Sequence, residues 1–404
     1  MRCGLLGRTL GHSYSPAIHK LLNEYSYELF SREPEDVEGF VKLGPWDGCN
    51  VTIPYKKEVV QYCTELSDLA KELGSVNTLL RLPSGGIYGD NTDAAGFKAM
   101  AKRLPVTYAG KKALVFGTGG ASVTVQAVLK HLGCQVTVVS RTGDVTYDDL
   151  DRFSDAQVLV NTTPVGMYPK TGESVVDLGM FPKAEAVLDV VYNPARTKLI
   201  LDAEERGIPC ESGLYMLVAQ AARASEIWTN STIETDKLEA VHKAIGSGMQ
   251  NLILVGMPGC GKSTVGFKLA RATGRWLVDA DQELVKRAGM EIPQYMERYG
   301  VESFRKLEAE VLRDLGKESG LVIATGGGCV TREENYRSLH QNGTIIWLQR
   351  DLADLPADGR PLSQKEGVQA LYETRKPLYE AFSDFAIQNT GDPDLTVEEI
   401  IKMI

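Results

Sequence analysis

Residues 256–263, G-M-P-G-C-G-K-S, have the spacing of a phosphate-binding loop and lie beyond the midpoint of this 404-residue chain. The apolar run 251–255 (N-L-I-L-V) predicts a buried strand before the loop, and the residues from Thr264 onward predict a helix after it. Backbone N–H groups at such a helix start surround phosphate oxygens, Lys262 reaches the outer phosphates, and the Ser263 hydroxyl binds Mg²⁺. The predicted nucleotide-binding residues are Gly259, Gly261, Lys262, Ser263 and Thr264.

Composition and charge narrow the class of protein. Hydrophobic residues make up 43% of the chain and charged residues 24%, which is typical of a globular protein with material for two or three domains. The formal net charge of −9 argues against nucleic acid or an anionic membrane as a partner. The seven cysteines show no metal-ligand spacing, and neither a signal-peptide pattern nor a membrane-length apolar run is present. We therefore expect a cytoplasmic protein with reduced thiols.

A second glycine-rich turn, 117–121 (G-T-G-G-A), follows the strand-like run 111–116. Apolar residues at helical spacing come next, and this order is typical of a Rossmann unit, in which glycines let the backbone approach a pyrophosphate. The next strand-like run, 135–139, ends at residues 140–142 (S-R-T), where the residue that reads the ribose is expected. Arg141 would hold the 2′-phosphate of NADP there, and a solvated surface arginine is the alternative. The predicted dinucleotide-binding residues are Gly117, Gly119, Gly120, Ala121, Ser140, Arg141 and Thr142.

Two further apolar runs, 156–160 and 186–191, predict more strands of the same sheet. Ligands of open α/β sheets bind at the carboxyl ends of the strands. We therefore expect the turns that follow these runs to face the cofactor, with Met167 among the cofactor-binding residues. Plain turns are the alternative.

The first ninety residues contain four polar clusters between short apolar runs. They are 11–16 (G-H-S-Y-S-P), 49–56 (C-N-V-T-I-P-Y-K), 75–78 (S-V-N-T) and 89–93 (G-D-N-T-D). Short polar side chains with amides, one lysine and one aspartate suit a small, polyhydroxylated, anionic substrate. Taken singly, the serines of the first cluster could instead cap a helix, and the asparagines could be turn residues.

Read together and in this order, the four clusters resemble shikimate dehydrogenase over roughly residues 5–240, including a family glutamine motif at 216–220 (M-L-V-A-Q). The resemblance implies that Lys56 is the catalytic lysine and that Asp93 is its partner. Reduction of the ketone of 3-dehydroshikimate would then take hydride from NADPH and a proton from Lys56. The substrate-binding residues that the resemblance implies are Ser13, Ser15, Thr52, Asn77 and Gln220.

One feature departs from the pattern of this family. NADP-specific members often carry a second arginine shortly after an N-R-T turn, whereas this chain has Gly143 and Asp144 there, and Ser140 in place of the asparagine. We still expect NADP(H), and comparable turnover with NAD would contradict that expectation.

From about residue 249 the chain resembles shikimate kinase, with further motifs in family order. These are D-A-D at 279–281, F-R-K-L-E at 304–308, G-G-G at 326–328 and R-P-L at 360–362. The resemblance implies ATP as the phosphate donor, Mg²⁺ bound with the help of Ser263 and Asp279, and Lys262 and the lid residue Arg360 as catalytic residues. The substrate-binding residues that it implies are Asp281, Arg305, Gly327, Gly328 and Arg375. The two aspartates could instead cap the helix that begins near residue 282.

The predicted architecture is α/β throughout. A shikimate dehydrogenase-like unit would combine an α/β substrate domain, residues 1–93 and 213–245, with a Rossmann NADP domain, residues 94–212. A P-loop kinase domain, residues 249–404, would follow. The small residues of 244–248 (A-I-G-S-G) predict a short flexible tether between them.

The sequence therefore predicts a bifunctional enzyme that reduces 3-dehydroshikimate to shikimate and then phosphorylates shikimate to shikimate 3-phosphate. Its predicted cofactors are NADP(H), ATP and Mg²⁺, and its partners are these small molecules rather than nucleic acid or membrane. The oligomeric state stays open. Two alternatives are a dehydrogenase that also or instead takes quinate, and a nucleotide-dependent sensor without catalysis.

Overall fold

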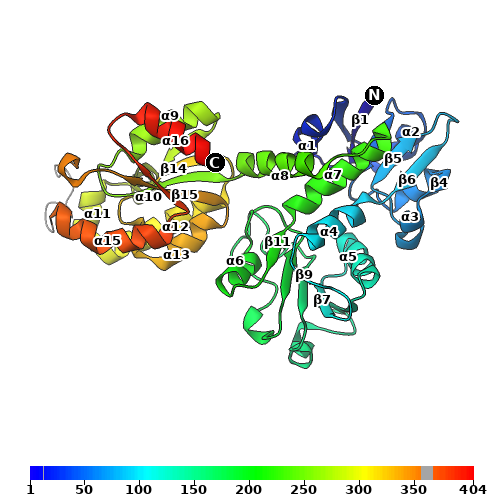
Figure 1. The fold of residues 1–404 in the computed structure, drawn as a ribbon, viewed down its shortest axis with the longest axis horizontal. Coiled ribbons are helices and arrows are strands. Elements are labelled where there is room, and N and C mark those ends of the chain that lie inside the picture. The colour runs from blue at the N-terminus through cyan, green and yellow to red at the C-terminus, as the bar shows by residue number, and fades with distance from the viewer. Residues whose placement is uncertain (12, 356–366) are drawn as a thin grey trace. The chain divides into compact units, whose positions relative to one another are not determined.

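The computed structural model describes residues 1–11, 13–355 and 367–404 (Figure 1). By its internal contacts the chain forms two compact units. Unit 1 comprises residues 1–166, 173–192 and 202–246, and unit 2 comprises residues 167–172, 193–201 and 247–404. Both units contain sheets with covering helices, so the predicted α/β fold class is confirmed.

The first sheet of unit 1 is mixed, with strand order β2-β1-β3-β5-β6-β4. Its strands are β1 (Arg2–Gly7), β2 (Ser26–Ser31), β3 (Gly48–Val51), β4 (Glu65–Leu66), β5 (Thr78–Arg81) and β6 (Ile87–Asp90). The helical segments around it are α1 (Ser15–Leu22), α2 (Pro34–Leu43), η1 (Glu58–Tyr62) and α3 (Asp68–Leu73). Strand β1 pairs in parallel with β2 and β3, whereas β5 runs antiparallel to β3 and β6. The polar clusters of the sequence therefore lie at the ends of neighbouring strands.

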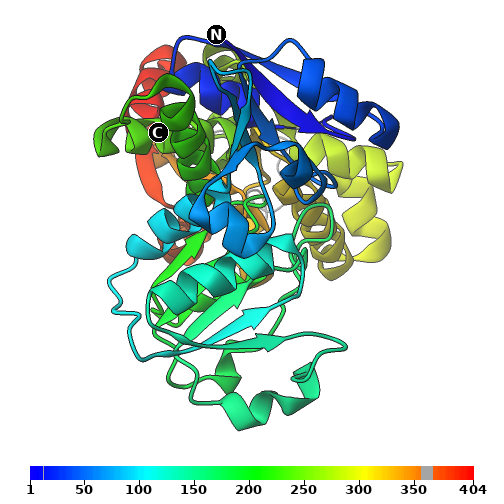
Figure 2. The same cartoon turned by 90° about the vertical axis from the view of Figure 1, so that its right-hand side faces the viewer.

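The second sheet of unit 1 is entirely parallel, with strand order β11-β10-β9-β7-β8. Its strands are β7 (Lys112–Phe116), β8 (Gln135–Val139), β9 (Val158–Asn161), β10 (Ala186–Asp189) and β11 (Cys210–Ser212). The helical segments of this region are α4 (Thr92–Lys102), α5 (Gly120–His131), η2 (Tyr147–Phe153), η3 (Leu178–Met180) and α6 (Lys198–Glu205). Figure 2 shows both sheets of unit 1, the first in blue and the second in cyan to green. Strand order reverses at β7, and parallel sheets of this kind bind ligands at such a point.

Helix α7 (Leu214–Thr229) packs along α4 and against α1, and so returns the chain to the first sheet (Figure 1). The approach is close, because a Cβ added at Gly96 of α4 would lie 2.6 Å from the carbonyl oxygen of Met216. At the far end of α7, a Cβ added at Gly48 would meet the ring of Trp228 at 2.6 Å. Small residues at the crossing points thus allow two elements distant in sequence to close one domain.

The predicted flexible tether at residues 244–248 is wrong, because these residues lie within helix α8 (Thr235–Met249). Apolar anchors explain the difference. Ile245 is 7% exposed and Met249 is 2% exposed, and an added Cβ at Gly246 would touch Leu214 at 3.3 Å. Burial on one face of the helix therefore outweighs the weak helix propensity of the two glycines.

The sheet of unit 2 is also parallel, with strand order β13-β14-β12-β15-β16. Its strands are β12 (Asn251–Val255), β13 (Trp276–Asp279), β14 (Leu321–Ala324), β15 (Gly343–Gln349) and β16 (Phe385–Gln388). The helical segments are α9 (Lys262–Thr273), α10 (Ala280–Ala288), α11 (Ile292–Tyr299), α12 (Val301–Lys317), η4 (Cys329–Thr331), α13 (Glu333–His340), η5 (Leu352–Asp354), α15 (Val368–Phe382) and α16 (Pro393–Met403). Strand β12 lies at the centre with every residue buried, as both faces of the sheet are covered. The loop after β12 therefore opens at the carboxyl edge of the sheet, where ligands bind.

Among the helices of the described ranges, none is both long and apolar enough to cross a membrane.

Candidate active sites

A pocket of about 300 Å³ in unit 1 collects residues from both of its sheets. All seven catalytic and substrate-binding residues that the sequence predicts for this half of the chain line it. They are Ser13, Ser15, Thr52, Lys56, Asn77, Asp93 and Gln220. Ala121, predicted as a cofactor residue, lines the same pocket from the start of α5. The predicted substrate residues therefore meet at one place, and one predicted cofactor residue reaches them.

The centre of this pocket is an ion pair between Lys56 and Asp93. The Lys56 ammonium lies 2.6 Å from Oδ2 of Asp93, with the two side chains 27% and 19% exposed. Asp93 Oδ1 accepts a hydrogen bond of 2.8 Å from the Asn77 amide, whose oxygen accepts one of 2.7 Å from the backbone N–H of Thr92. Because both carboxylate oxygens of Asp93 are hydrogen-bonded, the Lys56 ammonium has a defined position in the pocket wall.

The serines of the first cluster lie at the start of α1, where Tyr14 is the N-cap and makes no side-chain capping bond. Ser13 precedes this cap, and its Oγ accepts a hydrogen bond of 3.2 Å from the backbone N–H of Ser15, the first residue of the helix. Both serines nevertheless line the pocket. At the opposite wall, Gln220 donates to the Leu217 carbonyl oxygen at 2.9 Å, and its side-chain oxygen lies 3.4 Å from the Thr92 hydroxyl.

The glycine-rich turn between β7 and α5 has the shape that a pyrophosphate needs. Gly117 has φ 107°, and a Cβ there would lie 2.9 Å from the Thr163 side chain and 3.0 Å from the Thr162 hydroxyl. Gly119 caps α5, and the space that a Cβ would fill at Gly119 and Gly120 is open. Open glycine backbone at a helix start is the arrangement that binds anions, so the residues fit a dinucleotide.

The residues that would read the ribose follow β8. Ser140 is 8% exposed, and its backbone N–H donates to the Val145 carbonyl oxygen at 3.1 Å. Arg141 and Thr142 are exposed. Met167 is 44% exposed, and its contact with the cofactor stays a prediction.

Some residues of this pocket were not singled out from the sequence. Tyr192 follows β10, and its ring meets that of Tyr14 edge-on, with centroids 6.1 Å apart. Burial raises the pKa of Tyr192, so it is a neutral hydroxyl at physiological pH. Asn50 also lines the pocket but is only 5% exposed. Tyr192 belongs to the turn predicted after the run 186–191, whereas Asn50 carried no signal beyond its place in the second cluster.

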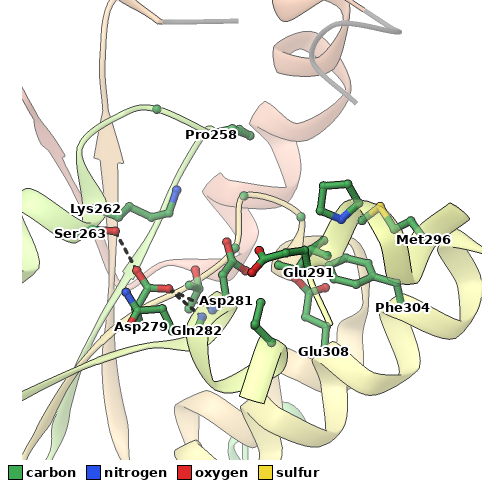
Figure 3. Close-up of a pocket in the computed structure, with 18 of the residues that line it drawn as sticks. Pro258, Lys262, Ser263, Asp279, Asp281, Gln282, Glu291, Met296, Phe304 and Glu308 are labelled. Atoms are coloured by element: carbon green, nitrogen blue, oxygen red, sulfur yellow. Dashed lines mark hydrogen bonds between the residues drawn. The ribbon is translucent and has the colours of Figure 1, made fainter. Parts of the chain in front are cut away.

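In unit 2 a pocket of about 1030 Å³ opens around the phosphate-binding loop (Figure 3). Gly259, Gly261, Lys262, Ser263 and Thr264 all line it. Gly261 has φ 103°, and a Cβ there would lie 2.5 Å from the Asn389 amide nitrogen, which donates to the Cys260 carbonyl oxygen at 2.7 Å. The Lys262 ammonium donates to the carbonyl oxygens of Gly256, at 2.8 Å, and Met257, at 3.0 Å. Contacts with both ends of the loop therefore fix its conformation.

The Ser263 hydroxyl and the Asp279 carboxylate lie together beside this loop. The Ser263 hydroxyl donates to Asp279 Oδ2 at 2.9 Å, as the dashed line in Figure 3 marks. Asp279 Oδ1 accepts from the backbone N–H groups of Asp281, at 3.0 Å, and Gln282, at 3.3 Å. Asp279 thus caps α10, as the alternative reading held, and also faces Ser263. A hydroxyl and a carboxylate are ligands that Mg²⁺ prefers, so these residues fit the metal.

Two arginines of this pocket, Arg305 and Arg375, donate hydrogen bonds to buried acceptors. Arg305 donates to Glu308 Oε2 at 2.6 Å, with the side chains 11% and 4% exposed. Arg375 is 5% exposed and donates to the Gly327 carbonyl oxygen at 2.9 Å. Burial raises the pKa of Glu308, and its Oε1 has no hydrogen-bond partner among the described residues. This wall therefore carries two guanidinium groups in fixed positions, suited to an anion.

The three glycines after β14 each lie against a different part of the site. A Cβ at Gly326 would lie 2.8 Å from Asp281 Oδ1, and one at Gly327 would lie 2.6 Å from the Pro258 ring. A Cβ at Gly328 would meet the Arg305 guanidinium. Asp281 itself lines the pocket, and burial, followed by the charge of Asp279, raises its pKa.

Two further arginines, Arg350 and Arg360, concern this pocket. Arg350, which follows β15, lines it and was not predicted, because nothing in the local sequence distinguishes this arginine from a surface one. Its buried Nε has no hydrogen-bond partner among the residues that the structure describes. Arg360, the predicted lid arginine, lies outside the described residues.

Comparison with known proteins matches both halves of the chain. The family model described as shikimate dehydrogenase substrate binding domain matches residues 5–79, and the shikimate kinase model matches residues 258–404. A shikimate dehydrogenase (NADP(+)) of Clostridium perfringens strain 13 is 35% identical over 268 residues, covering 60% of this chain and 97% of that protein. The corresponding protein of Methanopyrus kandleri is 36% identical over 276 residues, covering 60% of this chain and 93% of its own length.

Solved structures agree. A chorismate mutase/shikimate 5-dehydrogenase fusion protein from Clostridium acetobutylicum is 36% identical with a TM-score of 0.58, covering 61% of this chain and 97% of that one. The shikimate 5-dehydrogenase of Thermus thermophilus, in complex with NADP(H) and shikimate, is 31% identical with a TM-score of 0.54, covering 60% of this chain and 99% of that one.

Proposed function

Because the chain belongs to the shikimate dehydrogenase family and carries a shikimate kinase domain, we propose that it catalyses two consecutive reactions. The first reduces 3-dehydroshikimate to shikimate with NADPH, and the second phosphorylates shikimate to shikimate 3-phosphate with ATP. The observation that carries this proposal is the presence of two pockets that contain predicted reacting groups, Lys56 and Asp93 in the first and Lys262 in the second. The product of the first reaction is the substrate of the second.

In the dehydrogenase pocket, Lys56 acts as the acid. NADPH, when bound at the Gly117 turn, supplies the hydride. The Lys56 ammonium donates a proton to the ketone oxygen as negative charge develops on it. Asp93, which lies 2.6 Å from the ammonium, orients the lysine and accepts a hydrogen bond from a ring hydroxyl. Ser13 and Ser15 bind the substrate carboxylate at the start of α1.

In the kinase pocket, the reaction depends on alignment and charge neutralisation. Arg305 and Arg375 bind the carboxylate of shikimate, and Asp281 accepts a hydrogen bond from a ring hydroxyl. Lys262 neutralises charge on the outer phosphates. Mg²⁺, when held with the help of Ser263 and Asp279, neutralises further phosphate charge. We retain Arg360 as the predicted lid residue.

We also propose that the domains follow the predicted bounds, with a substrate domain of residues 1–93 and 213–245, a Rossmann domain of residues 94–212 and a kinase domain of residues 249–404. One sheet for each supports this division. A cytoplasmic location is proposed as well. All seven cysteines are free, as expected of a reducing compartment, and fractionation of cells with an antibody to the chain tests the location.

The experiment that tests the function incubates the purified chain with 3-dehydroshikimate, NADPH and Mg-ATP and identifies the acids by mass spectrometry. Shikimate 3-phosphate is the expected product. The matched variants are Lys56→Ala, which should stop ketone reduction and spare phosphorylation of added shikimate, and Lys262→Ala, which should do the reverse. Shikimate as the end product would overturn the kinase assignment, and an unreacted ketone acid would overturn the dehydrogenase assignment. Quinate in place of shikimate tests the altered-substrate alternative.

A further inference from the structure

A buried aromatic cluster lies behind the dehydrogenase pocket and has no part in the chemistry above. His19 of α1 is fully buried, with its ring stacked on Tyr27 at a centroid distance of 4.0 Å and on Trp228 at 5.2 Å. His19 and Tyr27 come from the neighbouring elements α1 and β2, whereas Trp228 comes from α7, which lies far from both in the sequence. Burial lowers the pKa of His19 to about 3, so the ring is neutral under ordinary conditions.

The hydrogen bonds of His19 determine which nitrogen carries the proton. His19 Nε2 lies 3.1 Å from Asn50 Oδ1, and His19 Nδ1 lies 2.6 Å from the Tyr25 hydroxyl. The Asn50 amide is oriented by its nitrogen, which donates to the Asn77 carbonyl oxygen at 3.4 Å and to the Thr78 hydroxyl at 3.1 Å. Asn50 Oδ1 can only accept, so Nε2 carries the proton and Nδ1 accepts from Tyr25.

From Asn50 the hydrogen bonds continue to the ion pair of the pocket. The Thr78 hydroxyl, which receives the Asn50 amide, lies 3.1 Å from Asn77 Oδ1. The Asn77 amide nitrogen in turn donates to Asp93 at 2.8 Å, and Asp93 pairs with Lys56. Asn50, Thr78 and Asn77 are each 5% exposed or less, so no solvent competes for these bonds.

The same cluster also reaches the carboxylate end of the pocket. The Tyr27 hydroxyl donates to Asn50 Oδ1 at 2.8 Å, so this oxygen accepts from both His19 and Tyr27. The Ser15 side chain interacts with the Tyr27 hydroxyl as well and acts to lower its pKa, against the larger effect of burial. The Asn50 amide oxygen, which accepts from two buried donors, thus connects the hydrogen bonds of Ser15 with those of the Lys56–Asp93 pair.

We propose that His19 is a positioning residue for the dehydrogenase reaction, because its Nε2–H holds the Asn50 amide on which the alignment of Asn77 and Asp93 depends. This inference rests on the proposed dehydrogenase function. His19 does not line the pocket, and its proposed effect on catalysis is transmitted through Asn50. A histidine kept only for packing would support stability and leave the pocket geometry unchanged.

A matched pair of variants in the full chain separates the two roles. The amide of His19→Gln reaches the position of Nε2 and can still donate to Asn50, whereas the amide of His19→Asn reaches only the position of Nδ1, toward Tyr25. Both lose the stacked ring, so both lose similar packing. The readouts are kcat/KM for shikimate oxidation with NADP⁺, the KM for NADP⁺, and the melting temperature.

We expect His19→Asn to lower kcat/KM for shikimate on the order of 10- to 100-fold, as for other lost supports of a reacting group, and His19→Gln to stay within about fivefold of wild type. The KM for NADP⁺ should change by less than about twofold in both. Equal values of kcat/KM in the two variants would overturn the proposal. Wild-type turnover of shikimate in the same assay tests the proposed function separately, since the variants are read against it.

If both histidine variants fail to fold, a third variant tests the proposal. Tyr27→Phe retains the stacked ring and removes the hydroxyl that donates to Asn50 Oδ1 and interacts with Ser15. We expect its kcat/KM for shikimate to fall by about 5-fold or more while the melting temperature stays near that of wild type. Full activity in Tyr27→Phe would show that the pocket stays aligned when the Asn50 oxygen loses a donor, and would also overturn the proposal.

Discussion

Substitution of Gly328 by alanine should weaken shikimate binding in the kinase pocket without disturbing the fold. Gly328 has φ −106°, a backbone conformation that alanine adopts, so the substitution introduces no backbone strain. The added Cβ would lie 2.5 Å from Nη1 of Arg305 and closer still to Nη2. The guanidinium would therefore have to move, while its bond of 2.6 Å to Glu308 holds it in place.

The size of the effect follows from this displacement. An ordinary contact distance of 3.4 Å requires Nη1 to shift by about 0.9 Å, and the nearer Nη2 by more. Such a shift is enough to lose one hydrogen bond between charged groups, which contributes about 1.5–3 kcal/mol. At about 1.4 kcal/mol for each factor of ten, the KM for shikimate should rise roughly 10- to 100-fold. The KM for ATP should stay within about twofold, because the loop at 256–263 is untouched.

The assay measures initial rates of phosphorylation at varied shikimate and at varied ATP. Gly248→Ala is the matched control, since this glycine lies in α8 of the same chain and an added Cβ there would meet nothing within 4 Å. The dehydrogenase rate serves as an internal measure of protein concentration. A KM for shikimate within about twofold of wild type in Gly328→Ala would refute the assignment of Arg305 to the substrate carboxylate.

Three further predictions address other parts of the two sites. Arg141→Ala should raise the KM for NADP⁺ by about tenfold and leave that for NAD⁺ unchanged, and equal effects on both would contradict a role in 2′-phosphate binding. Burial, and then the charge of Asp279, raise the pKa of Asp281 above the 3.8 of an unperturbed aspartate. Kinase kcat/KM should therefore fall as the pH decreases through this raised pKa, and the same acidic decrease in Asp281→Asn would refute the assignment. Asn389→Ala should lower kinase kcat by about tenfold, because the Cys260 carbonyl oxygen loses its donor and the loop loosens, and unchanged steady-state kinetics would show that the loop needs no such support.

Much of the two sites could be predicted from the sequence because their chemistry sits in short local motifs. Glycines that need positive φ, such as Gly117 and Gly261, mark turns at fixed positions between a strand and a helix. The fold class follows from the alternation of apolar runs with helical segments. The family resemblance then carried residue roles that periodicity alone could not assign.

The features that escaped prediction depend on contacts between distant segments. His19 reads as one polar residue on a short helix, and its importance emerges only when Tyr27, Asn50 and Trp228 are brought around it. The helical state of residues 244–248 depends likewise on burial of Ile245 and Met249, which composition does not reveal. In both cases tertiary packing overrides the local signal.

The return of α7 to the first sheet sets the order in which a newly made chain can become active. Lys56 and Asp93 leave the ribosome early, but Gln220 and Trp228, which close the same pocket and core, follow more than a hundred residues later. Contacts at such separation form late, so the reductase pocket stays open until the whole Rossmann sheet has been synthesised. A fragment cut at the end of β11 would keep the Lys56–Asp93 pair and lose Gln220, which lines the same pocket. Excision of a working reductase must therefore extend beyond Thr229.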